Sequence, residues 1–329
     1  MAEEKILVTG ALGCAGAWVV RNLIRQGVPT AAFVRSGGMH RLQLIMSPQE
    51  IARIQFIRGD VADLASVQKA VQESAATSII HLAALQLPFC RANPSLGASV
   101  NVVGTVNVFE AAKQAGLKRV VYASTTAVYG LTEEYPAGRI PHDALLKPRT
   151  LYGVYKQANE GTAKVYWLEY GISSIGLRPY VIYGAGRDQG VTSTPTKAML
   201  AAAAGRDYRI SYGGRYCFQY GDDIAKQFIA ATRVPFEGAD AFANGGPSNS
   251  TEEIIACIQK VEPGMASKLS YDPTPLPFPP EFDNSALVKV LGPLPYTPLE
   301  QGVRETIDIF KRALSDGRIT PEALESQLR

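Results

Sequence analysis

Short apolar runs recur along the chain, and longer amphipathic stretches separate the early ones. The runs are rich in β-branched residues and mostly end at Gly, Asp or Pro; they span residues 5–10, 30–35, 54–60, 78–84, 119–125, 173–179 and 240–246. Their nearly continuous apolar character is typical of strands that are buried on both faces. The stretches between the early runs are long enough for crossover helices. The pattern therefore predicts an α/β fold with a doubly wound parallel sheet.

Three glycines stand where the first apolar run meets the first amphipathic stretch, in the sequence TGALGCAG. Gly10 suits a tight turn with positive φ, and Gly13 lets a pyrophosphate approach the amino end of the next helix. Gly16 lets that helix pack closely against the strand. Because the motif follows a strand and opens a helix, it predicts a dinucleotide site in a Rossmann-type sheet. The residues expected to contact the cofactor in this loop are Gly10, Gly13, Cys14, Ala15 and Gly16.

The alternation of strands and helices becomes irregular after residue 180, where Gly and Pro are more frequent. We expect residues 1–180 to form a dinucleotide-binding Rossmann domain, with a sheet that is completed by residues 215–247. Residues 181–214 and 248–329 are expected to form a small C-terminal substrate-binding lobe.

The end of the second predicted strand indicates which dinucleotide binds. An NAD site usually has an Asp or Glu about 20 residues after the glycines. This strand instead ends in Arg35 and Ser36. A guanidinium can bind a 2′-phosphate, which a carboxylate would repel. NADP is therefore favoured and NAD is the alternative, in which case Arg35 faces solvent. Asp60 and Val61, after the third strand, are placed to meet the adenine, although Asp60 would serve equally as a loop cap.

Tyr152 and Lys156 are four residues apart in TLYGVYK and so share one face of a predicted helix. A phenol has a pKa near 10 and is a poor base at neutral pH. A nearby ammonium group favours the phenolate and lowers that pKa. The pair is therefore a candidate proton relay. Tyr155 points to another face of the helix and is expected to be structural.

At this point the sequence resembles the extended short-chain dehydrogenase/reductases, also called the NAD-dependent epimerase/dehydratase family. The resemblance covers nearly the whole chain, and its motifs are TGALGCAG, GDVAD, HLAA, NPSLGASVNVVGTVNVFEAAKQAG, STTAVYG, YGVYK, LRPYVIYGAGR and YGDDIA. It implies that Thr125, Tyr152 and Lys156 are catalytic and that Lys156 also binds the nicotinamide ribose. It further implies cofactor contacts at Ala83, Ala84 and Pro179, and structural roles for His81 and Asn101.

The same resemblance implies a homodimer. In this family the helices that match residues 94–115 and 151–170 form a four-helix interface. Those segments carry more apolar residues than one face of a sheet requires, including Val102, Val106, Val165 and Trp167.

The sequence also departs from the family pattern in two places. Family dehydratases follow the catalytic Thr with Asp-Glu, whereas here Thr126 and Ala127 follow, so dehydration is not expected. Nucleotide-sugar enzymes carry a diphosphate-binding Arg where this chain has Tyr216, and Arg215 stands one residue early, on the opposite face of a strand. We therefore expect a smaller substrate, such as a free sugar, a sugar acid or another hydroxy or keto compound. The candidate substrate contacts are Thr126, Arg187 and Tyr216.

Three functions remain open at this stage. The first is a dehydrogenase or reductase that exchanges its cofactor at each turnover. The second is a sugar or nucleotide-sugar epimerase that retains NAD. The third is a catalytically silent NADP sensor, which Tyr152 and Lys156 argue against because a sensor needs no proton relay.

Composition narrows the class of protein further. The net charge is only +3 and the basic residues are scattered, so nucleic acid is not an expected partner. The four cysteines lack CxxC spacing and are expected to be free. Ligand spacing typical of a metal site is absent, so no metal is expected. The chain has no apolar run of about 20 residues and an acidic amino end, so we expect a cytoplasmic protein that does not bind membranes.

Overall fold

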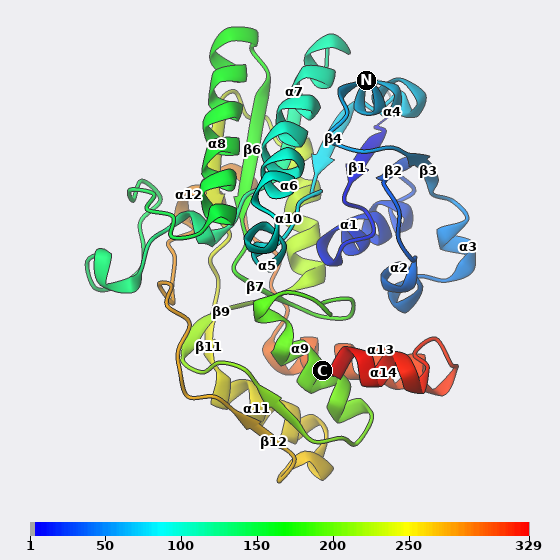
Figure 1. Ribbon diagram of the computed structural model, residues 1–329, viewed down its shortest axis with the longest axis vertical. Helices are drawn as coiled ribbons and strands as arrows, with labels where there is room; N and C mark the ends of the chain where they lie inside the picture. Colours follow the sequence, from blue (N-terminus) through cyan, green and yellow to red (C-terminus); the bar gives the residue numbers. More distant parts are fainter. Residues whose placement is uncertain (1–3, 329) are drawn as a thin grey trace.

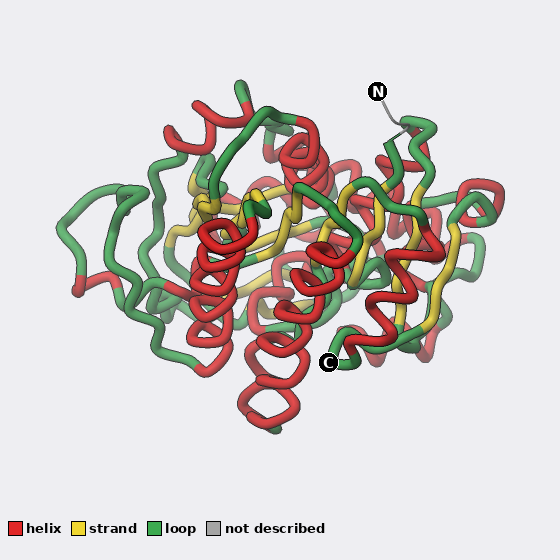
Figure 2. Tube along the Cα trace, turned by 90° about the horizontal axis from the view of Figure 1, so that it is seen from above, coloured by secondary structure: helices red, strands yellow, loops and turns green. Residues whose placement is uncertain are grey.

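The computed structural model describes residues 4–328, in which a central parallel sheet is covered by helices on both faces (Figures 1 and 2). The sheet has seven strands in the order β3-β2-β1-β4-β5-β6-β10. Their bounds are β1 Ile6–Thr9, β2 Thr30–Val34, β3 Gln55–Arg58, β4 Ser78–His81, β5 Arg119–Ala123, β6 Ser173–Arg178 and β10 Ala239–Ala243. All seven predicted strands are therefore confirmed, and each paired strand runs parallel to its neighbours.

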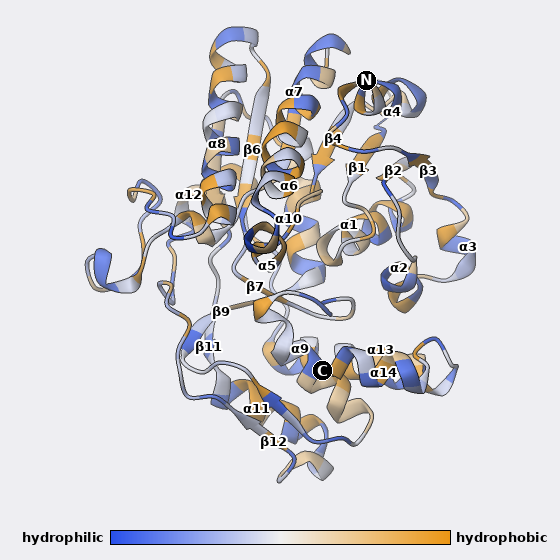
Figure 3. Ribbon diagram, viewed as in Figure 1, coloured by the Kyte–Doolittle hydropathy of each residue, from blue (hydrophilic) through white to orange (hydrophobic). Residues whose placement is uncertain are grey.

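Alternate side chains of the sheet fill two separate cores. Ile6 and Val8 of β1 belong to the core beneath α1 (Cys14–Arg25) and α10 (Gly221–Arg233), whereas Leu7 belongs to the core on the other face. That second core lies under α4 (Leu64–Ser74), α7 (Gly104–Gln114) and α8 (Leu151–Tyr170). All three β1 side chains are buried, which explains the continuous apolar run in the sequence. Apolar residues accordingly dominate β1 and β4 in the middle of the sheet (Figure 3).

Most remaining elements form a second, smaller part of the molecule, at the bottom of Figure 1. A three-stranded sheet joins β7 (Val181–Tyr183), β9 (Arg215–Tyr220) and β11 (Ser248–Ser250), and a two-stranded sheet joins β8 (Tyr208–Ile210) and β12 (Leu269–Tyr271). The helices that accompany these strands are α9 Thr194–Ala203, α11 Thr251–Val261, α13 Leu299–Ser315 and α14 Pro321–Leu328. A further helix, α12 (Ser285–Leu291), lies near α10 and β10.

The segment 215–247 does not enter the central sheet as a whole. Its helix α10 and strand β10 belong to that part of the fold, but β9 pairs with β7 and β11 in the smaller sheet. The range expected to complete the central sheet is thus too wide at its start. The division into a cofactor-binding domain and a substrate-binding lobe stays a prediction.

The predicted helix 94–115 is a continuous helical run that contains an irregular turn. It consists of α6 (Pro94–Ala98), a π-helical turn (Ser99–Val103) and α7. The short helix α5 (Leu87–Ala92) precedes it, and α2 (His40–Ile45) and α3 (Pro48–Ile51) follow β2. A single π turn within a helix is often found at a functional site. The other predicted helix, 151–170, is α8 without interruption.

Candidate active site

The glycine loop between β1 and α1 is built for close backbone contact. Gly10 has a φ of +67°, and a Cβ atom there would lie 2.6 Å from the backbone nitrogen of Ala83. A Cβ atom on Gly16 would lie 2.1 Å from the carbonyl oxygen of Gly10. Side chains at either position would therefore push α1 and the chain after β4 away from the loop. The tight packing that was predicted for Gly16 is confirmed.

The amino end of α1 is open toward a ligand. Gly13 is the N-cap residue, and within the described residues no side chain caps the helix there. The N–H groups of the first helical turn, which includes Cys14 and Ala15, have no partners within a helix and attract anions. The loop thus fits the pyrophosphate of a dinucleotide, both in its shape and in its N–H donors.

A cavity of about 230 Å³ opens beside this loop at the carboxyl ends of the strands. The predicted cofactor residues that line it are Gly10, Gly13, Arg35, Ser36, Asp60, Val61, Ala83 and Ala84. Apolar residues that the sequence analysis did not single out complete the wall, among them Leu12, Phe33, Leu82, Leu85 and Val100. In open α/β sheets ligands bind at this edge. The cavity therefore unites the predicted contacts to the adenosine half of a dinucleotide.

Arg35 and Asp60 face each other across one end of the cavity. The Arg35 Nη1 atom lies 3.9 Å from the Asp60 Oδ2 atom, and both side chains are largely exposed. The other Asp60 oxygen accepts a hydrogen bond from the backbone nitrogen of Ala62 at 2.9 Å, so this carboxylate also caps a loop. An exposed ion pair of this kind is worth little, about 0–1 kcal/mol. A phosphate could therefore displace Asp60 from Arg35 at low cost.

The proposed proton relay lies where α8 meets the ends of β5 and β6. The Lys156 Nζ atom is buried and donates a hydrogen bond to the carbonyl oxygen of Ala123 at 2.7 Å. It also lies 5.9 Å from the centre of the Tyr152 ring. The Tyr152 hydroxyl hydrogen-bonds with the side chain of Thr125, which directly follows Ser124 at the end of β5. The three residues predicted to be catalytic therefore lie together.

Burial dominates the titration of both groups of the relay. It raises the pKa of the Tyr152 phenol, whereas the hydrogen bond with Thr125 and the positive charge of Arg187 lower it. It lowers the pKa of the Lys156 ammonium to about 8, although Cys90 and Glu160 act in the opposite direction. The phenol is therefore protonated at neutral pH and Lys156 is mostly charged. Tyr152 is thus a proton donor first and becomes a base only when its surroundings stabilise the phenolate.

A buried charged network that the sequence analysis missed supports the relay. Glu160 pairs with Arg178 of β6 through two hydrogen bonds of 2.7 and 2.8 Å, and the same carboxylate accepts a hydrogen bond from Ser124 at 2.5 Å. Arg178 also donates to the hydroxyl of Tyr129. Glu160 stands four residues after Lys156 on α8, so helical spacing alone places it on the same face. It joins that face to both β5 and β6.

Asn101 lies in the π turn and fixes one wall of the cavity. Its side chain accepts a hydrogen bond from the backbone nitrogen of Leu85 at 2.7 Å and donates one to the carbonyl oxygen of Leu85 at 2.9 Å. It was expected to be structural, and these contacts define that role. His81 is likewise buried, between the hydroxyls of Thr9 and Thr105, and burial lowers its pKa to about 3.

The remaining predicted site residues differ in their surroundings. Arg187 lies close enough to Tyr152 to affect the pKa of the phenol. Thr126 is buried, and its hydroxyl donates to the carbonyl oxygen of Pro179, itself buried at the end of β6. Tyr216 has no exposed surface, and its hydroxyl lies 3.2 Å from that of Thr251. A role for Thr126, Pro179 and Tyr216 in ligand binding stays a prediction.

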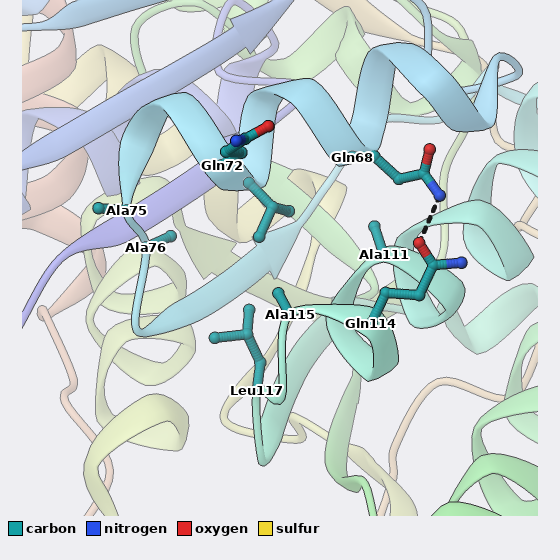
Figure 4. A pocket seen from close by; sticks show the side chains of 9 residues that line it. Gln68, Gln72, Ala75, Ala76, Ala111, Gln114, Ala115 and Leu117 are labelled. Carbon is teal, nitrogen blue, oxygen red and sulfur yellow. Dashed lines mark hydrogen bonds between the residues drawn. The ribbon is translucent and has the colours of Figure 1, made fainter.

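The described chain contains a second cavity, which lies away from the candidate active site. Figure 4 shows a cavity of about 430 Å³ between α4 and α7, which is lined by Gln, Ala and Leu side chains and a valine. It lies at the amino edge of the sheet, away from the glycine loop. Among residues 4–328 we find no group of three metal-ligating side chains and no disulfide. None of the helices in this part of the chain has the length and hydropathy needed to cross a membrane.

Comparison with known proteins identifies the family of this chain. A UDP-glucose 4-epimerase of Mycolicibacterium smegmatis is 30% identical over 327 residues, which cover 93% of this chain and 98% of that protein. A solved UDP-glucose 4-epimerase of Thermus thermophilus, in complex with NAD, is 25% identical with a TM-score of 0.78 and covers 94% of this chain and 99% of its own. An L-threonine dehydrogenase from Clostridium difficile shares the fold, with 24% identity, a TM-score of 0.81 and coverage of 97% and 100%. The model of the NAD dependent epimerase/dehydratase family matches residues 6–242, and this chain therefore belongs to that family of extended short-chain dehydrogenase/reductases.

Proposed function

We propose that this enzyme is an NADP-dependent dehydrogenase or reductase that acts on a small hydroxy or keto compound. The observation that carries the proposal is the juxtaposition of Tyr152, Thr125 and Lys156 at the carboxyl ends of the strands, the same edge of the sheet as the cavity beside the glycine loop. The family is established, but the net reaction, the substrate and the preferred dinucleotide are not.

Each residue of the relay has a distinct role in this proposal. The bound dinucleotide supplies the nicotinamide that accepts or gives the hydride. Thr125 orients the substrate oxygen through its hydroxyl. Tyr152 gives a proton to that oxygen during reduction and takes it back during oxidation. Lys156 holds the nicotinamide ribose and keeps a positive charge near the phenol, which favours the phenolate.

The surroundings of Arg215 and Tyr216 support a substrate without a diphosphate. Arg215 is exposed, and its guanidinium is bonded to the carbonyl oxygen of Ser248 and to the carboxylate of Glu253. Tyr216, at the family's arginine position, is buried against Tyr212. Neither side chain is placed as a phosphate clamp. The alternative is an epimerase that retains NAD, which the similarity to UDP-glucose 4-epimerases favours.

A substrate panel separates the two functions. We expect net change in absorbance at 340 nm with free sugars, sugar acids or small hydroxy ketones, and weak binding of UDP- and dTDP-sugars. Nucleotide-sugar enzymes carry a second diphosphate-binding Arg shortly before the stretch that matches residues 283–292, where this chain reads PFPPEFD. Together with the position of Tyr216, two missing arginines correspond to roughly 3–6 kcal/mol, or at least about a hundredfold in affinity. Micromolar binding of a nucleotide sugar, with epimerisation and no net cofactor reduction, would establish the epimerase instead.

Replacement of Tyr152 by Phe tests the relay. The variant loses only the hydroxyl, so we expect dinucleotide binding to persist while turnover falls by about 10²–10⁴-fold. Since burial raises the phenol pKa, wild-type oxidation should also speed up as the pH rises, and this dependence should vanish in Tyr152→Phe. Tyr155→Phe, whose hydroxyl bonds to the carbonyl oxygen of Pro94 on another side of α8, is the matched control. Equal activity of the two variants would refute the assignment.

Titration of the apo-protein with each dinucleotide tests the cofactor preference. If Arg35 binds a 2′-phosphate, the protein should bind NADP more tightly than NAD. The substitution Arg35→Ala should then lower the affinity for NADP by about tenfold or more and leave the affinity for NAD unchanged. Arg53→Ala removes the same charge from a position outside the cavity and should change neither affinity. Tighter binding of NAD by the wild-type protein would contradict the NADP preference.

We also propose that the protein acts as a cytoplasmic homodimer through α8 and the helical run 94–115, which ends in α7. Leu151, Val154, Val165 and Leu168 follow one another along α8 at helical spacing and are each at least 44% exposed. Val103 of the π turn is also exposed, whereas Val102, Val106 and Trp167 are half-buried.

Sedimentation at micromolar concentration tests the dimer. The double variant Val165→Lys, Leu168→Lys should be monomeric, because a dimer would bury the two new charges without partners. Lysine at Val288, an exposed residue of α12, is the control and should leave a dimer. A monomeric wild-type protein would contradict the proposed dimer.

A further inference from the structure

Arg187 occupies a glycine-rich turn between β7 and α9, in the smaller part of the molecule. Its backbone nitrogen donates to the carbonyl oxygen of Gly184 at 3.0 Å. A Cβ atom on Gly190 would lie 2.1 Å from the Gln86 Oε1 atom and 3.4 Å from the Arg187 Nη2 atom. A side chain at position 190 would therefore collide with Gln86, in the segment that follows β4, and the Arg187 guanidinium lies beside the same position. Leu85 of this segment lines the cofactor cavity, whereas Arg187 lines a separate, small pocket with Gly186, Asp188 and Thr196.

The guanidinium of Arg187 is not matched by an anion from residues 4–328. Its Nη2 atom donates to the hydroxyl of Thr192 at 3.0 Å, and its Nε atom is buried without a hydrogen-bond partner. The neighbouring carboxylate, Asp188, is instead held by Arg41 at 2.7 Å and by His40 at 2.9 Å. A half-buried charge without a partner is costly, so such a group is expected to bind an anionic ligand.

The positive charge of Arg187 acts on both parts of the candidate site. Burial raises the pKa of the Tyr152 phenol and of the Cys14 thiol in the first turn of α1, and the charge of Arg187 opposes both effects. Arg187 therefore lies within electrostatic reach of the proton relay and of the glycine loop.

We propose that Arg187 binds a carboxylate of the substrate, so that the enzyme acts on small hydroxy or keto acids, sugar acids included. The planar guanidinium presents paired N–H groups that match the two oxygens of a carboxylate. A diphosphate would need more than one such group, and Arg215 lies exposed at the start of β9, where it contacts Glu253 and the carbonyl oxygen of Ser248. This inference rests on the proposed function, because it names the substrate class for the same site.

Matched pairs of acids and neutral compounds test the inference. The probes are D-glucuronate with D-glucose, D-galacturonate with D-galactose, and D-glycerate with glycerol, each assayed at 340 nm with NADP and with NAD. We expect kcat/KM to be at least about tenfold higher for the acid of a productive pair. Arg187→Gln should lower kcat/KM for that acid by about tenfold to a hundredfold more than for its neutral partner, which loses only the effect of the Arg187 charge on Tyr152. Arg187→Lys should restore part of the loss, and Arg209→Gln, at an exposed residue paired with Asp272, should have no effect.

The outcomes separate this inference from the proposed function. Hydride transfer that favours the neutral compounds would overturn the carboxylate site and leave the oxidoreductase in place. If none of the compounds is oxidised, the oxidoreductase proposal fails for this panel, and calorimetry of the acids against the NADP complex decides the inference. Saturable binding that Arg187→Gln abolishes would support it, and no binding would contradict it. Weaker dinucleotide binding as the sole effect of Arg187→Gln would show that Arg187 binds cofactor phosphate instead.

Discussion

The buried ion pair between Glu160 and Arg178 holds the catalytic helix in place. It joins α8 to β6, and the Ser124 hydroxyl joins the same carboxylate to β5. Although burial opposes it, the hydrogen bonds and charge of Glu160 raise the pKa of Arg178, so this guanidinium is charged at every physiological pH. A buried pair with one partner removed costs about 3–5 kcal/mol, which makes the attachment strongly dependent on both residues. The positions of Tyr152 and Lys156 on α8 depend on this attachment.

The glycine loop forms the other side of the site, and it depends on the absence of side chains rather than on an ion pair between them. There the absence of side chains lets α1, β1 and the chain after β4 approach to backbone contact, and the amino end of α1 faces the cavity. Asn101 then fixes Leu85 by both of its backbone polar groups. The glycine loop and the Glu160–Arg178 pair thus shape the cofactor cavity and hold the proton relay separately, at the same edge of the sheet.

Much of this arrangement is predictable from the sequence, because it follows local rules. Strands buried on both faces give continuous apolar runs, and helical spacing places Tyr152 and Lys156 on one face. The predicted strands nevertheless extend too far at their carboxyl ends. Residues 82–84, for example, follow β4 but remain apolar because they line the cofactor cavity.

The parts that escaped prediction depend on contacts between residues far apart in the chain. The pairing of β9 with β7 and β11, the π turn around Asn101 and the Arg41–Asp188 ion pair have no periodic signal. Glu160 is the exception, because its spacing from Lys156 was visible in the sequence. Its partner Arg178, 18 residues away on β6, was visible only as part of a family motif.

We expect the docked face of α8 to present its proton relay to a dinucleotide that lies across the strand ends. A crystal structure of the complex with NADP tests this most directly. The account predicts that the pyrophosphate lies at the amino end of α1 and that the Lys156 Nζ atom is within about 3.2 Å of a hydroxyl of the nicotinamide ribose. It also predicts that Tyr152 and Thr125 face the nicotinamide from one side. A dinucleotide whose nicotinamide lies away from Tyr152, with α8 still docked on β5 and β6, would contradict the account.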